Sequence, residues 1–298
     1  MYTCFDEILA AARQREQKKK VVIAAAQDHE VLESAAQAKK LGIAEFTLVG
    51  DRDKIAQILS RLGEEAEAWQ IIHEADEHKA AQKSMALVAS GEADIPMKGL
   101  LHTATFMRAA FNKEFGLVAD KAVVSAVTIT EYPAQGRLML VTDCAINVAP
   151  DYETKIKLIN NAAAVAAKLG IGQPKVALIA AVETVNPSMQ ETVDASMLCK
   201  AAERGQIKGC LIDGPLALDN AISLQAAQVK NISGPVAGQA DILLMPNLLA
   251  GNVLDKALRY FGGLKTGCAI AGAQVPLIAT SRSDSALNKM HAIALSVL

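Results

Sequence analysis

The stretch VVIAAAQDHEVLESAAQAKKLGIAEFTLVG, residues 21–50, decides the fold class. It opens with an apolar run over 21–26 and closes with a second one over 46–50, and both runs predict strands. Between them, over 31–41, apolar residues recur on one face, and Lys39 and Lys40 precede Gly42 as helix stop signals. Apolarity in both runs is continuous rather than alternating, which is typical of strands covered on both faces.

The same alternation of strand and helix continues to the end of the chain. We predict a long helix over 152–169 and further strands at 93–99, 123–129, 137–143, 175–181, 209–215, 241–246 and 275–281. Only 123–129 and 137–143 are close enough to form a hairpin, through a turn that contains Pro133 and Gly136. The pattern predicts an α/β fold with mainly parallel sheets, and 298 residues suggest about two lobes.

Composition narrows the class of protein. Apolar residues make up 51% and aromatic residues only 4%, which predicts a core of aliphatic side chains. Thirty basic against 32 acidic residues leave a net charge of −2, which argues against sequence-blind nucleic-acid binding. No apolar run approaches the roughly 18 residues of a membrane helix. The N-terminal charges follow the apolar residues, the wrong order for a secretory signal.

Several common sites are absent from the sequence. There is no GxxxxGK[ST], no GxGxxG after a strand, no HExxH and no GxSxG, which disfavours P-loop nucleotidases, dinucleotide binding, zinc proteases and serine hydrolases. Five scattered cysteines without a CxxC pair argue against disulfides and a thiolate zinc site. We expect a cytoplasmic protein with no metal, no nucleic-acid partner and no membrane partner.

The strongest local motif is TSRSDS, residues 280–285, which ends a predicted strand and opens a helix. Helix N-termini bind anions, and the guanidinium of Arg282 suits phosphate. An ordinary cap formed by Ser281 or Ser283, with Arg282 in solvent, explains the same residues.

Three weaker motifs have two interpretations each. Gly251 and Asn252 suit either a close backbone approach to a ligand or a plain turn into a helix. Lys98 and Arg108 either bring positive charge to a cleft or lie on the surface. Cys144 is either a nucleophilic thiolate or a buried thiol.

Five blocks together resemble the phosphotransacylases, most closely the phosphate butyryltransferase branch and then the phosphate acetyltransferases. They are MKGLLHTATFMRA (97–109), LMLVTDCAINVAPDYETK (138–155), LIDGPLALDNAIS (211–223), SGPVAGQADILLMPNLLAGNVLDKAL (233–258) and PLIATSRSDS (276–285). The resemblance extends in order from about residue 21 to the C-terminus, and the blocks TDxAxNxAPD and DGPLALDNAIS are specific to this group.

The resemblance implies a reversible reaction in which acyl-CoA and phosphate give acyl phosphate and coenzyme A. The implied acyl group is butyryl or another short chain, with acetyl as the alternative. Coenzyme A and phosphate are substrates, and no cofactor or metal is implied. The implied fold has two lobes like those of isocitrate and isopropylmalate dehydrogenases, with the active site in the cleft between them. The expected lobes are 1–145 plus 270–298 and 146–269, in a homodimer or larger homo-oligomer.

The resemblance also assigns residue roles. Ser281 donates a hydrogen bond to the leaving thiolate or the developing oxyanion, and Arg282 binds phosphate. The remaining substrate-binding candidates are Arg137, Arg108, Ser125, Asp143 and Asn147, with Gly251 and Asn252 near the thiol end of coenzyme A.

One residue departs from the family pattern. Acetyltransferases have an aspartate, assigned as the base, at the position of Asn288. Either phosphate attacks already ionised, which we favour, or Asp284 substitutes as the base, or the chain is a poorer catalyst. A non-catalytic sensor of coenzyme A or acyl phosphate is the alternative function. A dehydrogenase of the same fold is disfavoured, because no aspartate constellation for a divalent metal is apparent.

Overall fold

The computed structural model describes residues 1–298, and the chain forms two compact units. The N-terminal unit comprises Phe5–Ala122 and Gly267–Leu298, and the central unit comprises Met1–Cys4 and Val123–Thr266. The expected boundary at residue 145 differs from this division, because the structure assigns the predicted hairpin to the central unit. The C-terminal segment Gly267–Leu298 belongs to the N-terminal unit.

The N-terminal unit contains a parallel four-stranded sheet with the strand order β3-β2-β1-β4. Its strands are β1 (Lys19–Ala24), β2 (Ala44–Gly50), β3 (Gln70–His73) and β4 (Ile95–Lys98). Val21 of β1 pairs with Phe46 of β2 on one side and with Ile95 of β4 on the other. The last four residues of β1 are all buried, as continuous apolarity predicts for a strand covered on both faces.

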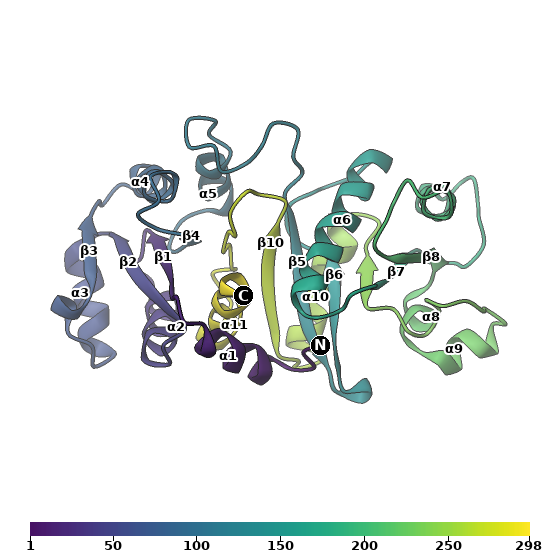
Figure 1. Ribbon diagram of the computed structural model, residues 1–298, viewed down its shortest axis with the longest axis horizontal. Helices are drawn as coiled ribbons and strands as arrows, with labels where there is room; N and C mark the ends of the chain where they lie inside the picture. Colours follow the sequence, from purple (N-terminus) through teal and green to yellow (C-terminus); the bar gives the residue numbers. More distant parts are fainter. The chain divides into compact units, whose positions relative to one another are not determined.

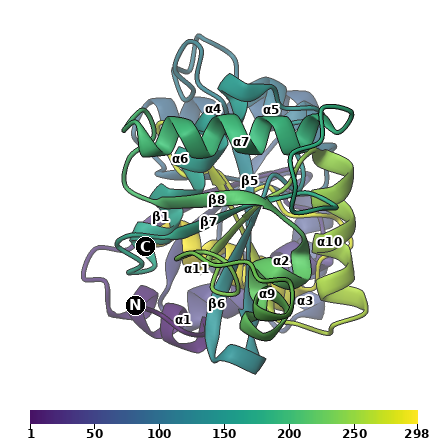
Figure 2. The same ribbon diagram turned by 90° about the vertical axis from the view of Figure 1, so that its right-hand side faces the viewer.

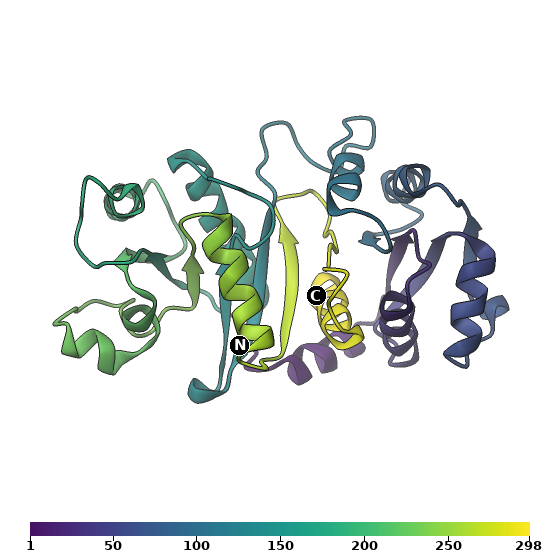
Figure 3. The ribbon, with the colours of Figure 1, turned by 180° about the vertical axis from the view of Figure 1, so that it is seen from behind.

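Helices cover both faces of this sheet. They are α1 (Phe5–Gln14), α2 (His29–Lys40), α3 (Arg52–Arg61), α4 (Glu77–Ala89), α5 (Thr103–Ala110) and α11 (Ala286–Val297), with a 3₁₀ turn at Ala66–Ala68. Figure 1 shows α4 and α5 together on one side of the strands and α2 on the other. Helix α11 packs against α2 and against α1, the purple helix beside it in Figure 3.

The observed α2 shows why the sequence forms a helix here. Asp28 precedes it as the N-cap, and its carboxylate accepts a hydrogen bond from the backbone N–H of Val31 at 2.9 Å. The helix ends at Lys40, and Gly42 then adopts a φ of 66°, which favours glycine. The helix predicted over 31–41 is therefore confirmed, with its start two residues earlier.

The second sheet has six strands in the order β10-β5-β6-β9-β7-β8, with β10 at Thr266–Ala271, and five of these strands lie wholly within the central unit. They are β5 (Ser125–Tyr132), β6 (Arg137–Thr142), β7 (Lys175–Ile179), β8 (Leu211–Leu216) and β9 (Ile242–Leu244). The predicted hairpin is confirmed, because β5 and β6 pair antiparallel while β6, β9, β7 and β8 pair in parallel. A 3₁₀ turn at Pro133–Gln135 and Gly136, at a φ of 60°, join the hairpin strands.

Five helices complete the central unit. They are α6 (Tyr152–Lys168), α7 (Gln190–Glu203), α8 (Leu218–Ile222), α9 (Leu224–Val229) and α10 (Leu248–Tyr260). Figure 2 shows α6 and α7 on one side of the strands and α9 on the other. The buried core is dominated by Ala, Val, Ile and Leu, as the composition predicts. None of the helices combines the length and apolarity that crossing a bilayer requires.

Three elements differ from the predictions. Strand β3 and strand β10 (Thr266–Ala271), which lies where the chain passes between the units, are not predicted from the sequence. The strand predicted over 275–281 is reduced to isolated bridges at Leu277 and Ile278. Ile278 pairs in parallel with Met97 of β4, so this short segment extends the N-terminal sheet beside β4.

Candidate active site

The predicted motif TSRSDS lies at the carboxyl edge of the N-terminal sheet, next to the end of β4. The backbone N–H of Lys98, the last residue of β4, donates to the carbonyl oxygen of Ile278 at 2.8 Å. Because carboxyl ends of parallel strands share one edge, the residues after β1 and β4 and the 280–285 loop gather there. This edge is where open α/β sheets bind their ligands.

Hydrogen bonds within the loop fix its shape. The backbone N–H of Ser281 donates to the Asp284 carboxylate at 2.8 Å, and the hydroxyls of Ser281 and Ser283 lie 3.1 Å apart. The buried ammonium of Lys289, on α11, donates to the carbonyl oxygens of Ser281 at 2.9 Å and Asp284 at 2.7 Å. The side chains of Ser281, Arg282 and Ser283 remain exposed on this ordered loop.

The helix cap predicted at Ser281 or Ser283 is wrong. Ser285 is the N-cap of α11, and its hydroxyl accepts from the backbone N–H of Asn288 at 3.3 Å. The loop is thus longer than the sequence indicates, and capping does not account for Ser281 and Arg282. The arrangement leaves one hydroxyl and one guanidinium available to a ligand.

Positive charge gathers beside this loop. Lys98 is only 3% exposed, and burial, Lys289 and Arg282 together lower the pKa of its ammonium to about 8. Asp28 and Asp284 oppose this shift but do not cancel it. Cations that lower the pKa of a neighbouring ammonium form a site that favours an anion.

Neither candidate for the base offers an exposed carboxylate. Asn288 lies in the first turn of α11 and carries no carboxylate. Asp284 is only 8% exposed, and its carboxylate accepts the N–H of Ser281. The structure therefore gives Asp284 a role in holding the loop, and its use as a base stays a prediction.

Arg108 lies on α5 and borders a hollow of about 160 Å³. His78 and Gln82 of α4 line the same hollow, with Thr105, Ala109 and Asn112. The guanidinium is exposed, and its predicted contact with phosphate stays a prediction.

In the central unit, four of the predicted residues come together at the end of β6. The buried carboxylate of Asp143 accepts the backbone N–H groups of Ala145 at 2.8 Å, Ile146 at 3.0 Å and Asn147 at 3.1 Å. The side-chain amide of Asn147 donates to the carbonyl of Val124 at 2.9 Å. These bonds make residues 143–147 a rigid loop, because a buried charge-assisted network resists opening.

Helix α10 holds that loop closely. A Cβ added at Gly251 would lie 2.1 Å from the carbonyl oxygen of Asp143, so only glycine permits this approach. The side chain of Asn252 donates to the carbonyl of Cys144 at 3.1 Å. Gly251 and Asn252 are therefore both in a helix and in close contact with the loop, and their contact with coenzyme A stays a prediction.

The structure does not bring Arg137 to this loop. Arg137 begins β6 and Asp143 follows its end, so six residues of extended chain, about 20 Å, separate them. Its guanidinium donates to the carbonyl of Ala240 at 2.8 Å and pairs with Asp241 at 3.2 Å. Arg137 thus has a structural ion pair where the resemblance implies an anion contact.

Ser125 and Cys144 are buried in the central unit. The hydroxyl of Ser125 accepts from the side-chain amide of Asn161 at 3.0 Å, and its contact with substrate stays a prediction. The thiol of Cys144 donates to the carbonyl of Val141 at 3.5 Å, which supports the interpretation as a buried thiol. None of the five cysteines forms a disulfide in the structure.

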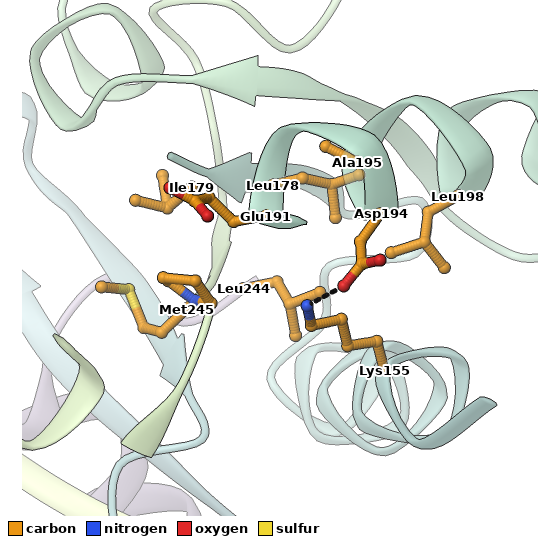
Figure 4. Close-up of a pocket in the computed structure, with 10 residues that line it drawn as sticks. Lys155, Leu178, Ile179, Glu191, Asp194, Ala195, Leu198, Leu244 and Met245 are labelled. Atoms are coloured by element: carbon orange, nitrogen blue, oxygen red, sulfur yellow. Dashed lines mark hydrogen bonds and ion pairs between the residues drawn. The ribbon is translucent and has the colours of Figure 1, made fainter. Parts of the chain in front are cut away.

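A hollow in the central unit surrounds a buried ion pair. Lys155 of α6 pairs with Asp194 of α7, and Gln190 donates to the same carboxylate at 2.8 Å. Figure 4 shows this pair beside the apolar side chains of Leu178, Leu198 and Leu244. The pair fastens α6 to α7, and no predicted site residue lines the hollow.

One group of side chains has donor atoms suited to a metal ion. His29, Glu30 and Glu33 of α2 offer one donor atom each, and these lie within 4.8 Å of one another. The carboxylate of Glu30 also accepts the backbone N–H of Ala286 at 2.9 Å, which ties α2 to α11. Exposed carboxylates commonly lie this close without an ion, so we assign no metal to the group.

Sequence reasoning missed the role of Lys289. Its buried ammonium organises the 280–285 loop from the apolar helix α11. A lysine within the apolar run ALNKMHAIALSV is the signal that was available, since a lysine in such a run needs a buried partner.

Comparison with known proteins identifies the family that this chain matches. The model of the family described as Phosphate acetyl/butaryl transferase matches residues 3–83 and 52–297. Phosphate butyryltransferase of Clostridium acetobutylicum is 48% identical over 273 residues, which cover 92% of this chain and 90% of that protein. Phosphate acetyltransferase of Thermotoga maritima is 38% identical over 275 residues, 92% of each chain.

Solved structures agree with these relatives. A branched-chain phosphotransacylase from Enterococcus faecalis superposes with a TM-score of 0.82 at 36% identity, over 93% of this chain and 97% of that one. A 4-hydroxythreonine-4-phosphate dehydrogenase from Klebsiella pneumoniae shares the fold at a TM-score of 0.50 and 13% identity, over 94% of this chain and 98% of that one. The expected likeness to a dehydrogenase fold is thereby confirmed.

Proposed function

The chain belongs to the phosphate acetyl/butaryl transferase family, and we propose from that premise that it transfers butyryl between coenzyme A and phosphate. In this reaction an oxygen of phosphate bonds to the thioester carbonyl carbon, and the carbon–sulfur bond breaks. The phosphate gives up one proton and the departing thiolate takes up one, so acyl phosphate and free thiol result. Coenzyme A and phosphate are substrates, and we assign no further cofactor.

The observation that carries the proposal is the cationic loop at the edge of the N-terminal sheet. Arg282 and the hydroxyl of Ser281 are exposed on a loop that Lys289 and Asp284 hold in place. A guanidinium binds two phosphate oxygens at once. Because the loop is already fixed, little conformational entropy is lost when phosphate binds. Holding phosphate against the thioester can supply roughly 7–11 kcal/mol of the barrier in the best cases.

The choice of butyryl rests on the relatives. The 48% identity to a butyryltransferase exceeds the 38% to an acetyltransferase. Each additional methylene buried in an acyl pocket contributes only about 0.8 kcal/mol, so acyl-CoA chains of neighbouring length will also react. Acetyl transfer is the second candidate for the specificity.

We also propose that the chain forms a homo-oligomer and works in the cytoplasm. Leu249, Val253 and Tyr260 lie on one exposed face of α10, and the adjoining Phe261 is 94% exposed. An apolar stripe of this kind on a helix commonly marks an interface between proteins. The five free thiols suit a reducing compartment.

The test is thiol release from butyryl-CoA, followed with a thiol reagent, with and without inorganic phosphate. We expect release that depends on phosphate and that is faster with butyryl-CoA than with acetyl-CoA. Arg282→Ala should lose about a hundredfold or more in rate, because one preorganised donor to a reacting anion is typically worth that much. Arg61→Ala, an exposed arginine of α3 in the same unit, serves as the matched control.

A different outcome would favour the sensor. Asn288 in place of the family aspartate is the observation behind that alternative. Saturable binding of coenzyme A, with no phosphate-dependent release from any short-chain acyl-CoA, would contradict the proposed transferase.

A further inference from the structure

Lys98 is a buried lysine without an acidic partner. Its ammonium donates only to the carbonyl oxygens of Gly99 and Leu101, each at 3.3 Å, and forms no ion pair. These are long hydrogen bonds to neutral groups. A charge that is taken out of water without a countercharge destabilises the fold. A ligand that supplies the opposite charge offsets this cost, so a buried lysine of this kind points to an anion site.

A second buried polar group, at the same edge of the sheet as Lys98, has no hydrogen-bond partner. The hydroxyl of Thr280 is buried and makes no hydrogen bond, and the residue is 3% exposed. Thr280 lies two residues after Ile278, whose carbonyl accepts the backbone N–H of Lys98. The parallel bridge between Met97 and Ile278 therefore carries both residues to the same edge of the sheet. A buried hydroxyl without a partner is destabilising, and it points to an acceptor that arrives from outside.

The neighbouring lysine shows the contrast. Lys289 is equally buried, but its ammonium is used at 2.7 Å and 2.9 Å to hold the carbonyls of Asp284 and Ser281. Lys289 is thus a positioning residue for the loop, whereas Lys98 and Thr280 have donors to spare for a ligand.

We propose that Lys98 and Thr280 bind the phosphate, with the Lys98 ammonium and the Thr280 hydroxyl both donating to phosphoryl oxygens. The inference rests on the proposed function and names two residues that complete its phosphate site together with Arg282. The same two donors hold the phosphoryl group of the acyl phosphate product. Burial makes each contact stronger than it is in water, because a low dielectric favours charge-assisted hydrogen bonds.

The pH dependence of phosphate binding follows from the groups that face Lys98. Lys289 from α11 and Arg282 from the loop lower its pKa, whereas Asp28 after β1 and Asp284 raise it, and with burial the pKa is about 8. The ammonium is charged below that pH and neutral above it. The KM for phosphate should therefore rise as pH passes upward through about 8.

The test uses Lys98→Met and Thr280→Val in the full-length protein, with Lys83→Met of α4 as an exposed control. We expect Lys98→Met to raise the KM for phosphate about tenfold or more, and Thr280→Val about threefold or more. The KM for butyryl-CoA should change by less than about twofold. The rise of the phosphate KM above pH 8 should disappear in Lys98→Met.

Stability separates a binding role from a structural one. Lys98→Met removes a buried charge that has no ion pair, and Thr280→Val removes a buried hydroxyl that has no hydrogen bond, so both variants should melt at or above the temperature of the parent. A structural role predicts a lower melting temperature and an unchanged phosphate KM, and that result would overturn the inference.

A binding measurement keeps this inference apart from the proposed function. Line broadening of the ³¹P resonance of inorganic phosphate reports binding whether or not the protein turns over. Broadening by the parent that is lost in Lys98→Met supports the inference even if no thiol is released, in which case only the transferase fails. No broadening by the parent, or equal broadening by Lys98→Met, overturns the inference even if transferase activity is present.

Discussion

At the scale of single residues, the departure from the family pattern at Asn288 decides how the reaction handles its proton. Phosphate is already largely ionised near neutral pH, so positioning against the thioester can suffice without a carboxylate base. The structure supports this interpretation, because the carboxylate of Asp284, the candidate substitute base, already accepts the backbone N–H of Ser281.

Asp284→Asn tests that interpretation. The amide oxygen of asparagine can still accept the N–H of Ser281, so the loop should keep its shape. We expect the rate of phosphate-dependent thiol release to fall by less than about tenfold. A loss near a thousandfold, with an unchanged melting temperature, would show that Asp284 acts as the base.

At the scale of elements, the loop at 143–147 depends on how closely α10 approaches it. Gly251→Ala places a methyl group 2.1 Å from a backbone carbonyl, which cannot move aside as a side chain can. Overpacking of this kind costs about 1–3 kcal/mol, so we expect a lower melting temperature. Gly172→Ala is the matched control, because nothing lies within 4 Å of its added Cβ. Equal melting temperatures for the two variants would contradict the close approach.

The buried pair between α6 and α7 gives a second prediction. Lys155→Met leaves Asp194 buried without its partner, and we expect unfolding free energy to fall by about 3–5 kcal/mol. The double variant Lys155→Met with Asp194→Leu should recover most of that loss, because no charge remains buried. Urea denaturation of the parent, Lys155→Met, Asp194→Leu and the double variant measures the coupling. If the double variant is no more stable than Lys155→Met, the pair does not act as described.

The sequence predicts the start of a helix or the position of a turn where a single capping or turn residue determines it. The start of α6 is visible in Asp151, which caps it, and the turn of the hairpin is visible in Gly136. Strand β3, QIIH, has too few apolar residues to be recognised, and β10 is polar at its start. The cap of α11 is ambiguous among three serines, and only the tertiary contacts of the loop select Ser285.

The site is only partly predictable for the same reason. Asp143, Asn147, Gly251 and Asn252 are predicted and do gather, because they follow or face the ends of parallel strands. Arg137 does not join them, although the predicted strand over 137–143 already places it at the opposite end from Asp143. The burial of Lys98 and Lys289 depends on packing between distant segments, which no local pattern shows.

At the scale of the whole molecule, the exposed face of α10 predicts self-association. Val253→Glu puts a charge in the middle of that face, so we expect light scattering to show a smaller mass than that of the parent. Val229→Glu on α9 is the control, since Val229 is also exposed but lies outside the stripe. A parent protein that is monomeric at micromolar concentration, or an unchanged mass for Val253→Glu, would contradict this interface.

The central claim is that phosphate, and not water, accepts the acyl group. The most direct measurement is the ³¹P spectrum of a reaction containing butyryl-CoA, inorganic phosphate and the protein. We predict a new resonance of butyryl phosphate that grows in step with free thiol and is absent with Arg282→Ala. Thiol release accompanied by butyrate alone, with the phosphate resonance unchanged, would contradict the account and identify a hydrolase.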